Sequence, residues 1–291
     1  MTIETIQCSS RGFTWTLPAR DVLTKPFLVD GEDHEPHLTA FIREYLHEGD
    51  TALDIGACFG FHTLEMSRQV GECGKVYAFE PQHEMYDLLV ANSTANHCDN
   101  ITAYHLALGD QAMPVCMYNA YEGDTNYGDS FISWKYKDMD AYTDSRQSEH
   151  IGKAGKMLTL NKKTTHCDTL DSFTFNRHVK FVKIDVQGFE RMVLIGGVKF
   201  FQKHRPVMVI EFEDTCMMFH NYTTKELIEH LRGMDYTVLL LDHSYPCDHV
   251  CVPNETMHSF RLQFGDRIHP HTTNNPINNN VVHGVTKKLV L

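Results

Sequence analysis

The chain has 291 residues, 42% of them hydrophobic and 22% charged, a composition typical of a globular protein with one substantial core. Its formal net charge of −12 would repel a phosphate backbone, so nucleic acid is not expected as the main partner. No stretch is apolar enough to cross a bilayer, and no secretory signal is recognisable near Met1. Nine cysteines without a framework spacing favour reduced thiols, and we therefore expect a cytoplasmic location.

Residues 1–50 are interpreted as a preface that packs on the core, with a short strand, a turn and a helix at about 38–47. From residue 51 onward, short β-rich runs alternate with longer helical periods, which indicates a parallel sheet wrapped by helices. Nearly continuous apolar runs, typical of strands covered on both faces, predict strands at 51–55, 75–80, 101–106, 179–185, 207–212 and 236–241. Helices are predicted at 61–70, 82–96, 189–203 and 224–233, the last behind an N-cap at Thr223.

An insertion at 118–165 interrupts the main domain, 51–268, and a polar tail follows at 269–291. The insertion is either a substrate lid or an irregular β-extension. Its aromatic residues suit either stacking on sugar rings or a small satellite core, and they are Tyr118, Tyr121, Tyr127, Phe131, Trp134, Tyr136 and Tyr142.

The first predicted strand ends in Asp54 and runs directly into a turn that contains Gly56 and Gly60. Glycines let the backbone bend sharply and approach a ligand without Cβ atoms. A dinucleotide turn needs glycines at its first, third and sixth positions. With Gly56 as the first position, the third is Cys58 and the sixth is Phe61, so the pattern fails. The turn therefore favours a ligand without phosphates.

Glu80, followed by Pro81, ends the next predicted strand. An acid at this edge of the sheet can accept hydrogen bonds from both hydroxyls of a ribose, which by itself indicates an adenosyl ligand. Because the pyrophosphate pattern fails, the two features together predict S-adenosylmethionine as the cofactor.

Three later blocks, at 167–171, 179–190 and 205–212, follow in order behind Asp54-Ile-Gly-Ala57 and Phe79-Glu80-Pro81. In this order the sequence resembles the FkbM methyltransferase family from about Glu35 to Phe212. The resemblance implies an α/β, Rossmann-like class I methyltransferase with a seven-stranded, mostly parallel sheet and helices on both faces. It also implies methyl transfer to a hydroxyl oxygen of a sugar, a glycan or another small molecule.

By the same resemblance, the cofactor would be held by Asp54, Gly56, Ala57, Gly60, Glu80 and Pro81, with Ala107 and Asp110 near the adenine. The family usually has Glu where this chain has Gln187, so a carboxylate is missing at that position.

Three residues are candidates for catalysis. Asp185 ends a buried strand at the carboxyl edge of the sheet, where ligands bind in open α/β folds, and would position the methyl donor or the nucleophile. Glu190 acts directly or is a first-turn acid favoured by the helix dipole. His166 would be a general base if the insertion folds over the site, and otherwise an exposed loop histidine. Strand alternation does not place Lys183 clearly, so it receives no role.

No metal site is assigned. His243, Cys247, His249 and Cys251 lie close together, but zinc usually needs a second pair of ligands from elsewhere. Two other functions stay open, a non-catalytic S-adenosylmethionine-binding module and a methyltransferase acting on protein or nucleic acid. A base methyltransferase is less favoured, because the sequence after the fourth strand lacks the Pro-Pro signature of amino methylation. The sequence does not define the oligomeric state.

Overall fold

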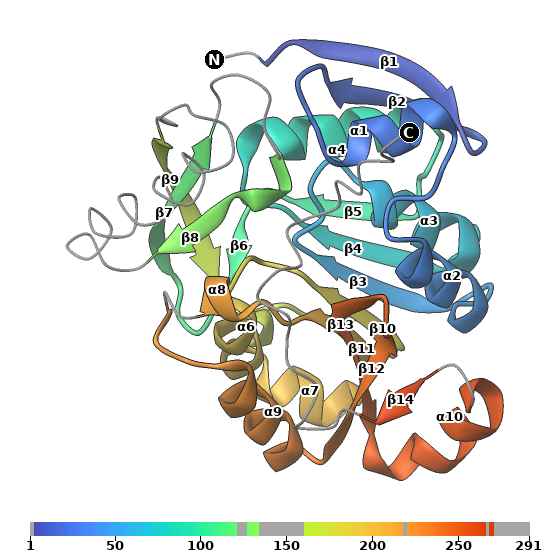
Figure 1. Cartoon of the computed structure of the whole chain (residues 1–291), viewed down its shortest axis with the longest axis vertical. Helices are drawn as coiled ribbons and strands as arrows, with labels where there is room; N and C mark the ends of the chain where they lie inside the picture. Colours follow the sequence, from blue (N-terminus) through green and yellow to red (C-terminus); the bar gives the residue numbers. More distant parts are fainter. Residues whose placement is uncertain (1–2, 121–126, 134–159, 218–219, 266–267, 271–291) are drawn as a thin grey trace, which may run out of the picture.

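The computed structural model describes residues 3–120, 127–133, 160–217, 220–265 and 268–270. At its centre lies one mixed sheet, with the strand order β14-β12-β13-β11-β10-β3-β4-β5 (Figure 1). Its strands are β3 (Thr51–Ile55), β4 (Lys75–Phe79), β5 (Ile101–Tyr104), β10 (Phe181–Ile184), β11 (Val207–Glu211), β12 (Tyr236–Asp242), β13 (Tyr245–Pro253) and β14 (His269–Pro270). Strands β5, β4, β3, β10 and β11 are parallel, and β13 runs antiparallel between β11 and β12. Apart from the two-residue edge strand β14, this is the expected seven-stranded class I methyltransferase sheet.

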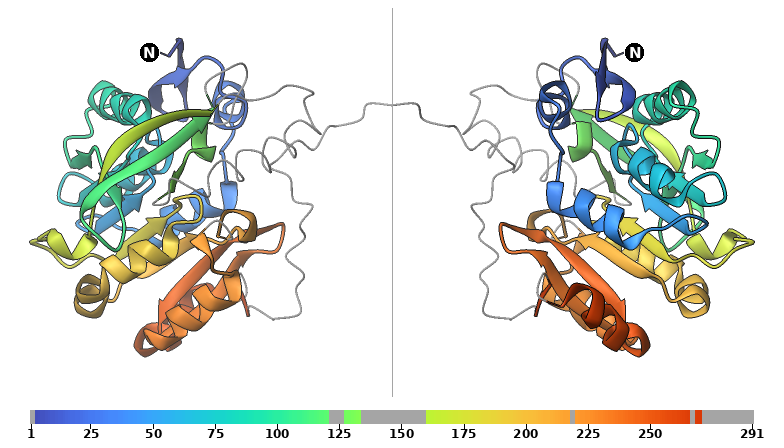
Figure 2. Two further views of the ribbon diagram at one scale, coloured as in Figure 1. Left: turned by 90° about the vertical axis from the view of Figure 1, so that its left-hand side faces the viewer. Right: turned by 90° about the vertical axis from the view of Figure 1, so that its right-hand side faces the viewer.

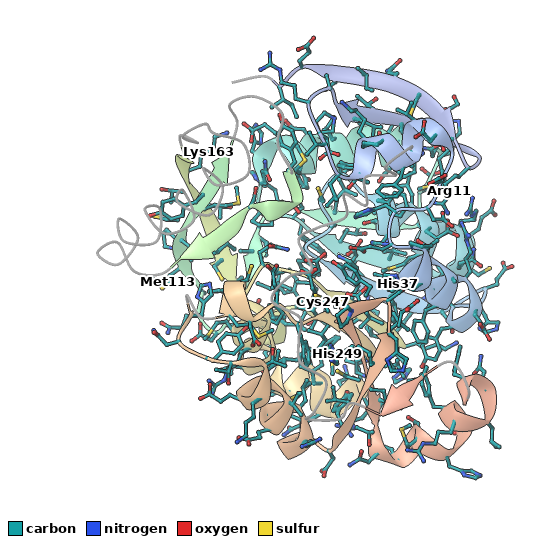
Figure 3. The ribbon with its side chains drawn as sticks, viewed as in Figure 1. Arg11, His37, Met113, Lys163, Cys247 and His249 are labelled. Atoms are coloured by element: carbon teal, nitrogen blue, oxygen red, sulfur yellow. The ribbon has the colours of Figure 1, made fainter. Side chains whose placement is uncertain are left out.

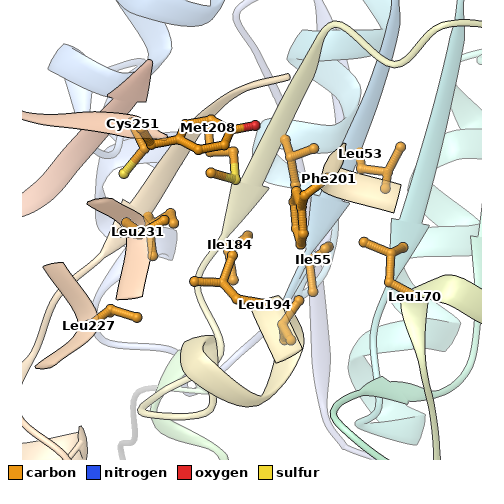
Figure 4. Close-up of a cluster of buried hydrophobic side chains, with 14 of the residues drawn as sticks. Leu53, Ile55, Leu170, Ile184, Leu194, Phe201, Met208, Leu227, Leu231 and Cys251 are labelled. Carbon is orange, nitrogen blue, oxygen red and sulfur yellow. The ribbon is translucent and has the colours of Figure 1, made fainter. Parts of the chain in front are cut away.

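Helices cover both faces of this sheet because its strands are apolar on both sides. One face packs against α2 (Pro36–Tyr45), α3 (Phe61–Val70), α4 (His83–Ala95) and α10 (Met257–Phe264). The other face packs against α6 (Glu190–Gly196), α7 (Val198–His204) and α9 (Thr224–Gly233), where Ile184 and Met208 of the sheet meet Leu194, Phe201 and Leu231 (Figure 4). The remaining helices are α1 (Thr24–Asp30), α8 (Asp214–Met217) and the 3-10 turns η1 (Tyr127–Asp129), η2 (Leu170–Ser172) and η4 (Asn254–Thr256).

The preface contains more structure than the sequence indicated, because two strands precede two helices. Strands β1 (Thr5–Ser10) and β2 (Phe13–Pro18) form an antiparallel hairpin. The backbone amides of Thr14 and Thr16 donate to the side chains of Asn96 and Asn92 at the end of α4, at 2.8 and 2.7 Å. These bonds fasten the hairpin to the core, and the preface is part of the folded unit.

The described part of the insertion forms a second sheet with its flanking residues. Strands β6 (Ala107–Leu108), β7 (Met113–Ala120), β8 (Phe131–Ser133) and β9 (Leu160–Asp168) pair in the order β6-β9-β7-β8. This sheet stands beside the main one, as the two side views show (Figure 2). Of the aromatic residues considered for sugar stacking, Tyr118 and Tyr127 are buried, and Tyr121, Trp134, Tyr136 and Tyr142 lie outside the described residues.

Two sequence predictions of helices and strands are corrected. The expected helix 189–203 is two helices, because the chain breaks at Gly197 and Asp171 caps the second by accepting from the amides of Lys199 and Phe200. The expected strand 101–106 ends at Tyr104, after which the chain leaves the main sheet to form β6.

The edge of the main sheet that is formed by β12, β13 and β14 also differs from the prediction. Strand β13 was not predicted, since its sequence mixes polar and apolar residues and one of its two partners, β11, lies well before it in the chain. His269 and Pro270, assigned to the polar tail, pair with Leu240 and Leu239 of β12. Residues 271–291 of that tail lie outside the described residues.

Candidate functional site

A cavity that is open to solvent lies where the parallel strands end. It is bounded by the turn after β3, by residues 79–82 after β4, by residues 106–108 and by residues 185–187 after β10. The second sheet closes it with Met117, Tyr127, Gly128, Ser130 and Ile132. The chain reverses its direction across the sheet between β3 and β10, and crevices at such switch points are the usual ligand sites of open α/β folds.

Gly56 is required at this turn for two reasons. Its φ of +84° is a left-handed conformation, and a Cβ at this position would lie 1.8 Å from the carbonyl oxygen of Asp185. The turn after β3 therefore packs directly against the end of β10. Ala57 follows as a buried residue whose amide donates to the carbonyl of Phe79.

Gly60 is needed for packing rather than for lining the cavity. It precedes α3 with a φ of +96°, and a Cβ there would lie 2.7 Å from Cδ1 of Leu89. The glycine thus lets α3 approach α4 closely, and Gly60 is not among the residues that line the cavity.

Glu80 connects the turn after β3 with the residues that follow β4, and both segments line the cavity. Its carboxylate accepts hydrogen bonds from the amides of Cys58 and Gln82, both at 2.7 Å. Burial raises the pKa of Glu80 to about 7, although the two backbone hydrogen bonds act in the opposite direction. Each carboxylate oxygen can accept a further hydrogen bond from a ligand in the cavity.

Lys183 is a buried cation at the centre of the site. Its Nζ lies 3.1 Å from Oδ2 of Asp185, 3.7 Å from Oδ1 of Asp54 and 3.3 Å from the carbonyl of Gly56. Burial tends to raise the pKa of Asp185, but Lys183 and the hydrogen bonds with Glu211 and Gln187 together outweigh burial, so the pKa falls below its usual value and the group is ionised. Sequence reasoning assigned no role to Lys183, whereas in the structure it is the counter-ion of two predicted site residues.

Asp54 lies beneath the turn rather than in the cavity wall. Its Oδ2 accepts from the hydroxyl of Thr63 at 2.6 Å, and its side chain is buried. Burial raises the pKa of Asp54, and Lys183 and Thr63 partly counteract this effect. Asp54 therefore acts on the cavity through Lys183 and through α3, to which Thr63 belongs.

Gln187 lines the cavity and connects Asp185 with Glu211, which lies outside the cavity wall. The side-chain amide of Gln187 donates to Oδ1 of Asp185 at 3.4 Å and to Oε2 of Glu211 at 3.1 Å, and its backbone is left-handed at φ +53°. Tyr245 donates its hydroxyl to Oε1 of Glu211 at 3.1 Å. Burial, together with the charge of Asp185, raises the pKa of Glu211 well above its usual value. Sequence reasoning missed Glu211, although its place at the end of β11 was a usable signal.

The other predicted site residues divide into two groups. Pro81 and Ala107 line the cavity, whereas Asp110, Glu190 and His166 do not. Glu190 is buried at the first turn of α6, where it accepts from the amides of Val186 and Gly188 and from the hydroxyl of Tyr222. His166 is exposed on β9, opposite Pro114.

Of the cluster considered for zinc, Cys247, His249 and Cys251 lie on β13, and Figure 3 labels the first two. Nδ1 of His249 lies 2.9 Å from the carbonyl of Cys247, and its ring stacks on Phe212 with centroids 4.1 Å apart. Among the described residues, no group of three or more His, Cys, Asp or Glu side chains is arranged to hold a metal ion. Nor does any helix in the described ranges have both the length and the apolarity needed to span a membrane.

Comparison with known proteins gives one match that covers most of this architecture. A family model described as the methyltransferase FkbM domain matches residues 54–238, more than half of the chain. A protein-L-isoaspartate O-methyltransferase of Methanococcoides burtonii is 34% identical over 82 residues, which are 28% of this chain and 40% of that protein. The chain thus spans less than half the length of this curated relative.

Two solved structures are similar at a lower level. The FkbM methyltransferase of Methylobacillus flagellatus KT has a TM-score of 0.42 and 13% identity, covering 78% of this chain and 52% of its own. Fibrillarin of Aeropyrum pernix, solved with natively bound S-adenosylmethionine, has a TM-score of 0.40 and 12% identity, covering 86% and 83%. Scores this low assign neither function nor substrate.

The matched region begins at Asp54, at the glycine turn, and ends in β12, so it includes both strand ends that meet at the cavity. The chain belongs to the methyltransferase FkbM domain family.

Proposed function

We propose that this protein transfers the methyl group of S-adenosylmethionine to a hydroxyl oxygen of a sugar or glycan. The observation that carries the proposal is Asp185, an ionised carboxylate that lines the cavity and is held by Lys183 and Gln187. A carboxylate in this position can accept a hydrogen bond from an acceptor hydroxyl and direct the oxygen toward the methyl group. The choice of a sugar rests on the family resemblance.

The cavity residues fit the cofactor. Gly56 and Cys58 of the glycine turn line the cavity together with Asp185, and the amino-acid part of the cofactor would lie beside them. Glu80 would accept hydrogen bonds from the ribose hydroxyls, and Pro81, Ala107, Met117 and Ile132 supply apolar surface for the adenine. Asp54 would act indirectly, and Gly60 through packing, as their positions indicate.

The bound cofactor supplies an already activated methyl group, so the tasks left to the protein are alignment and exclusion of water. The second sheet contributes buried Met117 and Ile132 to the wall of the cavity. Asp185 holds the acceptor, and Lys183 keeps that carboxylate charged during turnover.

We expect Glu80→Ala to weaken S-adenosylmethionine binding by about 1–3 kcal/mol, the scale of a lost charged hydrogen-bond partner. Calorimetric titration of the folded variant measures this change. Glu72→Ala, at an exposed position before β4, is the matched control and should bind like the wild type. An unchanged affinity in Glu80→Ala would refute the ribose assignment.

Cofactor affinity should also depend on pH through Glu80. In the free protein the pKa of this group is about 7, and only the ionised form accepts from both ribose hydroxyls. Protonation at lower pH therefore competes with binding, and the affinity should fall roughly tenfold from pH 8 to pH 6. Glu80→Gln should remove this dependence, which titrations at four pH values would reveal.

The acceptor is tested by incubating the full chain with methyl-labelled S-adenosylmethionine and a panel of methyl glycosides. The expected product is a methyl ether that survives mild base. An isoaspartyl peptide is included because of the similarity to the carboxyl methyltransferase, and its methyl ester would be lost in base. Label in that peptide or in added RNA would replace the sugar proposal. Cofactor binding without any transfer would favour a non-catalytic module.

The cytoplasmic location stays a prediction that cell fractionation tests.

A further inference from the structure

The side chain of Gln187 lies between two acids that come from neighbouring parallel strands. Its Nε2 is 3.4 Å from Oδ1 of Asp185, which follows β10, and 3.1 Å from Oε2 of Glu211, the last residue of β11. Gln187 is 8% exposed and lines the cavity, as Asp185 does. The amide therefore joins a carboxylate in the cavity wall to a second acid that lies behind it.

The neighbours of the Gln187 amide favour one orientation of this group. An NH2 group has two hydrogens and can donate one to each acid, whereas a carbonyl oxygen in the same place would face the ionised Asp185. With the NH2 group between the acids, Oε1 lies 3.5 Å from Sγ of Cys216, a weak donor on α8. The amide thus has a partner at both ends, which holds the side chain in place.

The backbone at Gln187 has a conformation that residues other than glycine rarely adopt. Its φ is +53°, and Gly188 follows with a φ of +93°. A left-handed backbone costs free energy when the residue carries a Cβ, and such strain is typical of functional sites. A glycine at position 187 would avoid the strain but would leave both acids without the amide. The side chain is therefore what this position requires.

Glu211 is itself anchored, so the bridge through Gln187 has a fixed far end. Tyr245 of β13 donates its hydroxyl to Oε1 of Glu211 at 3.1 Å, and Glu211 is buried. Burial and the charge of Asp185 raise the pKa of Glu211, whereas the pKa of Asp185 is lowered. Asp185 is therefore the member of the pair that ionises first, and Glu211 serves as its anchor.

We propose that Gln187 is a positioning residue that fixes the Asp185 carboxylate in the orientation that accepts the acceptor hydroxyl. This inference rests on the proposed O-methyl transfer. Lys183 holds Oδ2 of Asp185 at 3.1 Å and Gln187 holds Oδ1, so the plane of the carboxylate is defined from both sides.

The direction of the accepted hydroxyl matters for the transfer itself. As the acceptor oxygen forms its bond to the methyl carbon, the carbon–sulfur bond breaks with its electron pair left on sulfur, and the hydroxyl proton passes to Asp185. The oxygen must lie in line with the bond that breaks, and a misplacement of about 1 Å costs on the order of 100-fold in rate. Loss of the Gln187 amide should therefore lower kcat. It should alter cofactor affinity little, because Glu80 and Gly56 are unchanged.

The test compares two variants with wild-type protein, using the methyl glycoside that accepts label best. Gln187→Met keeps an unbranched side chain of similar size without a donor, and Gln187→Gly fits the left-handed backbone. Each should lose about tenfold or more in kcat, with the Kd for S-adenosylmethionine changed less than about threefold. His97→Gly is the matched control, because His97 has a φ of +54° at an exposed position after α4, and it should behave like the wild type.

A double-mutant cycle tests whether the anchor acts through the amide. Tyr245→Phe removes the hydroxyl that donates to Glu211 and should by itself lower kcat about threefold. In the Gln187→Met background the same substitution should have little further effect, because the connection to Asp185 is already broken. A loss by the same factor in both backgrounds would contradict the bridge, since a merely structural role of Tyr245 would not depend on Gln187.

This inference and the proposed function fail in different ways. If wild-type protein methylates a hydroxyl and both Gln187 variants keep kcat within about threefold, the positioning role is wrong and the proposed function stands. If kcat and cofactor affinity fall together, Gln187 acts on the cofactor and the inference is also wrong. If wild-type protein methylates no hydroxyl, both proposals fall. Should neither Gln187 variant fold, as judged by thermal unfolding, a normal kcat in Tyr245→Phe would overturn the inference and the expected loss would support it.

Discussion

Lys183→Met is expected to lower the free energy of unfolding by about 3–5 kcal/mol, the usual cost of breaking a buried ion pair from one side. Lys183 is 4% exposed and balances Asp54 and Asp185, so methionine would fill its space but leave two buried carboxylates without a counter-ion. In its absence the pKa of both acids would rise in the folded state. The destabilisation should therefore grow from pH 5 to pH 8, as unfolding increasingly releases protons that the folded acids retain.

Urea denaturation at these two pH values measures both effects. Lys180→Met is a suitable control, because Lys180 forms an ion pair of 2.6 Å with Asp50 but is 30% exposed. Solvent-exposed pairs contribute at most about 1 kcal/mol, so this variant should lose little stability. Equal losses in the two variants would mean that Lys183 is not the electrostatic centre of the site.

Asp185→Asn should leave the fold intact and reduce methyl transfer by about 100-fold or more. Asparagine has the same shape, but it removes the charge that Lys183 stabilises and places an amide where the acceptor hydroxyl would donate. Because Glu80 and the glycine turn are unchanged, the Kd for S-adenosylmethionine should change much less than kcat.

Initial rates on the accepted glycoside, calorimetry with S-adenosylmethionine and circular dichroism together test this expectation. Asp87→Asn, at an exposed position on α4, controls for the loss of one negative charge. Near-normal turnover in Asp185→Asn would remove this residue from the chemistry and leave it as the partner of Lys183 alone.

Local sequence patterns were sufficient for elements whose signals lie within a few residues. Helix α3 has the predicted bounds, and α9 begins behind Thr223, whose side chain and Glu226 form a capping box. The break at Gly197 was not predictable in this way, since the capping carboxylate of Asp171 comes from 28 residues earlier. Strand β13 was missed because its sequence mixes polar and apolar residues and because it pairs with β11, which lies well before it in the chain.

The same distinction between local signals and contacts distant in the chain applies to the site residues. Sequence alone was sufficient to place Gly56, Glu80 and Asp185 at one edge of the sheet, where they line the cavity, because each lies at the end of a strand and parallel strands bring their carboxyl ends to one edge. Only the tertiary structure decided that Lys183 lies between Asp54 and Asp185, and that Gln187 bridges Asp185 and Glu211. It also separated Gly60, which packs on Leu89, from Gly56, which faces Asp185. Periodicity and turn chemistry act over a few residues, whereas the burial and charge of these side chains depend on neighbours that only the folded chain brings together.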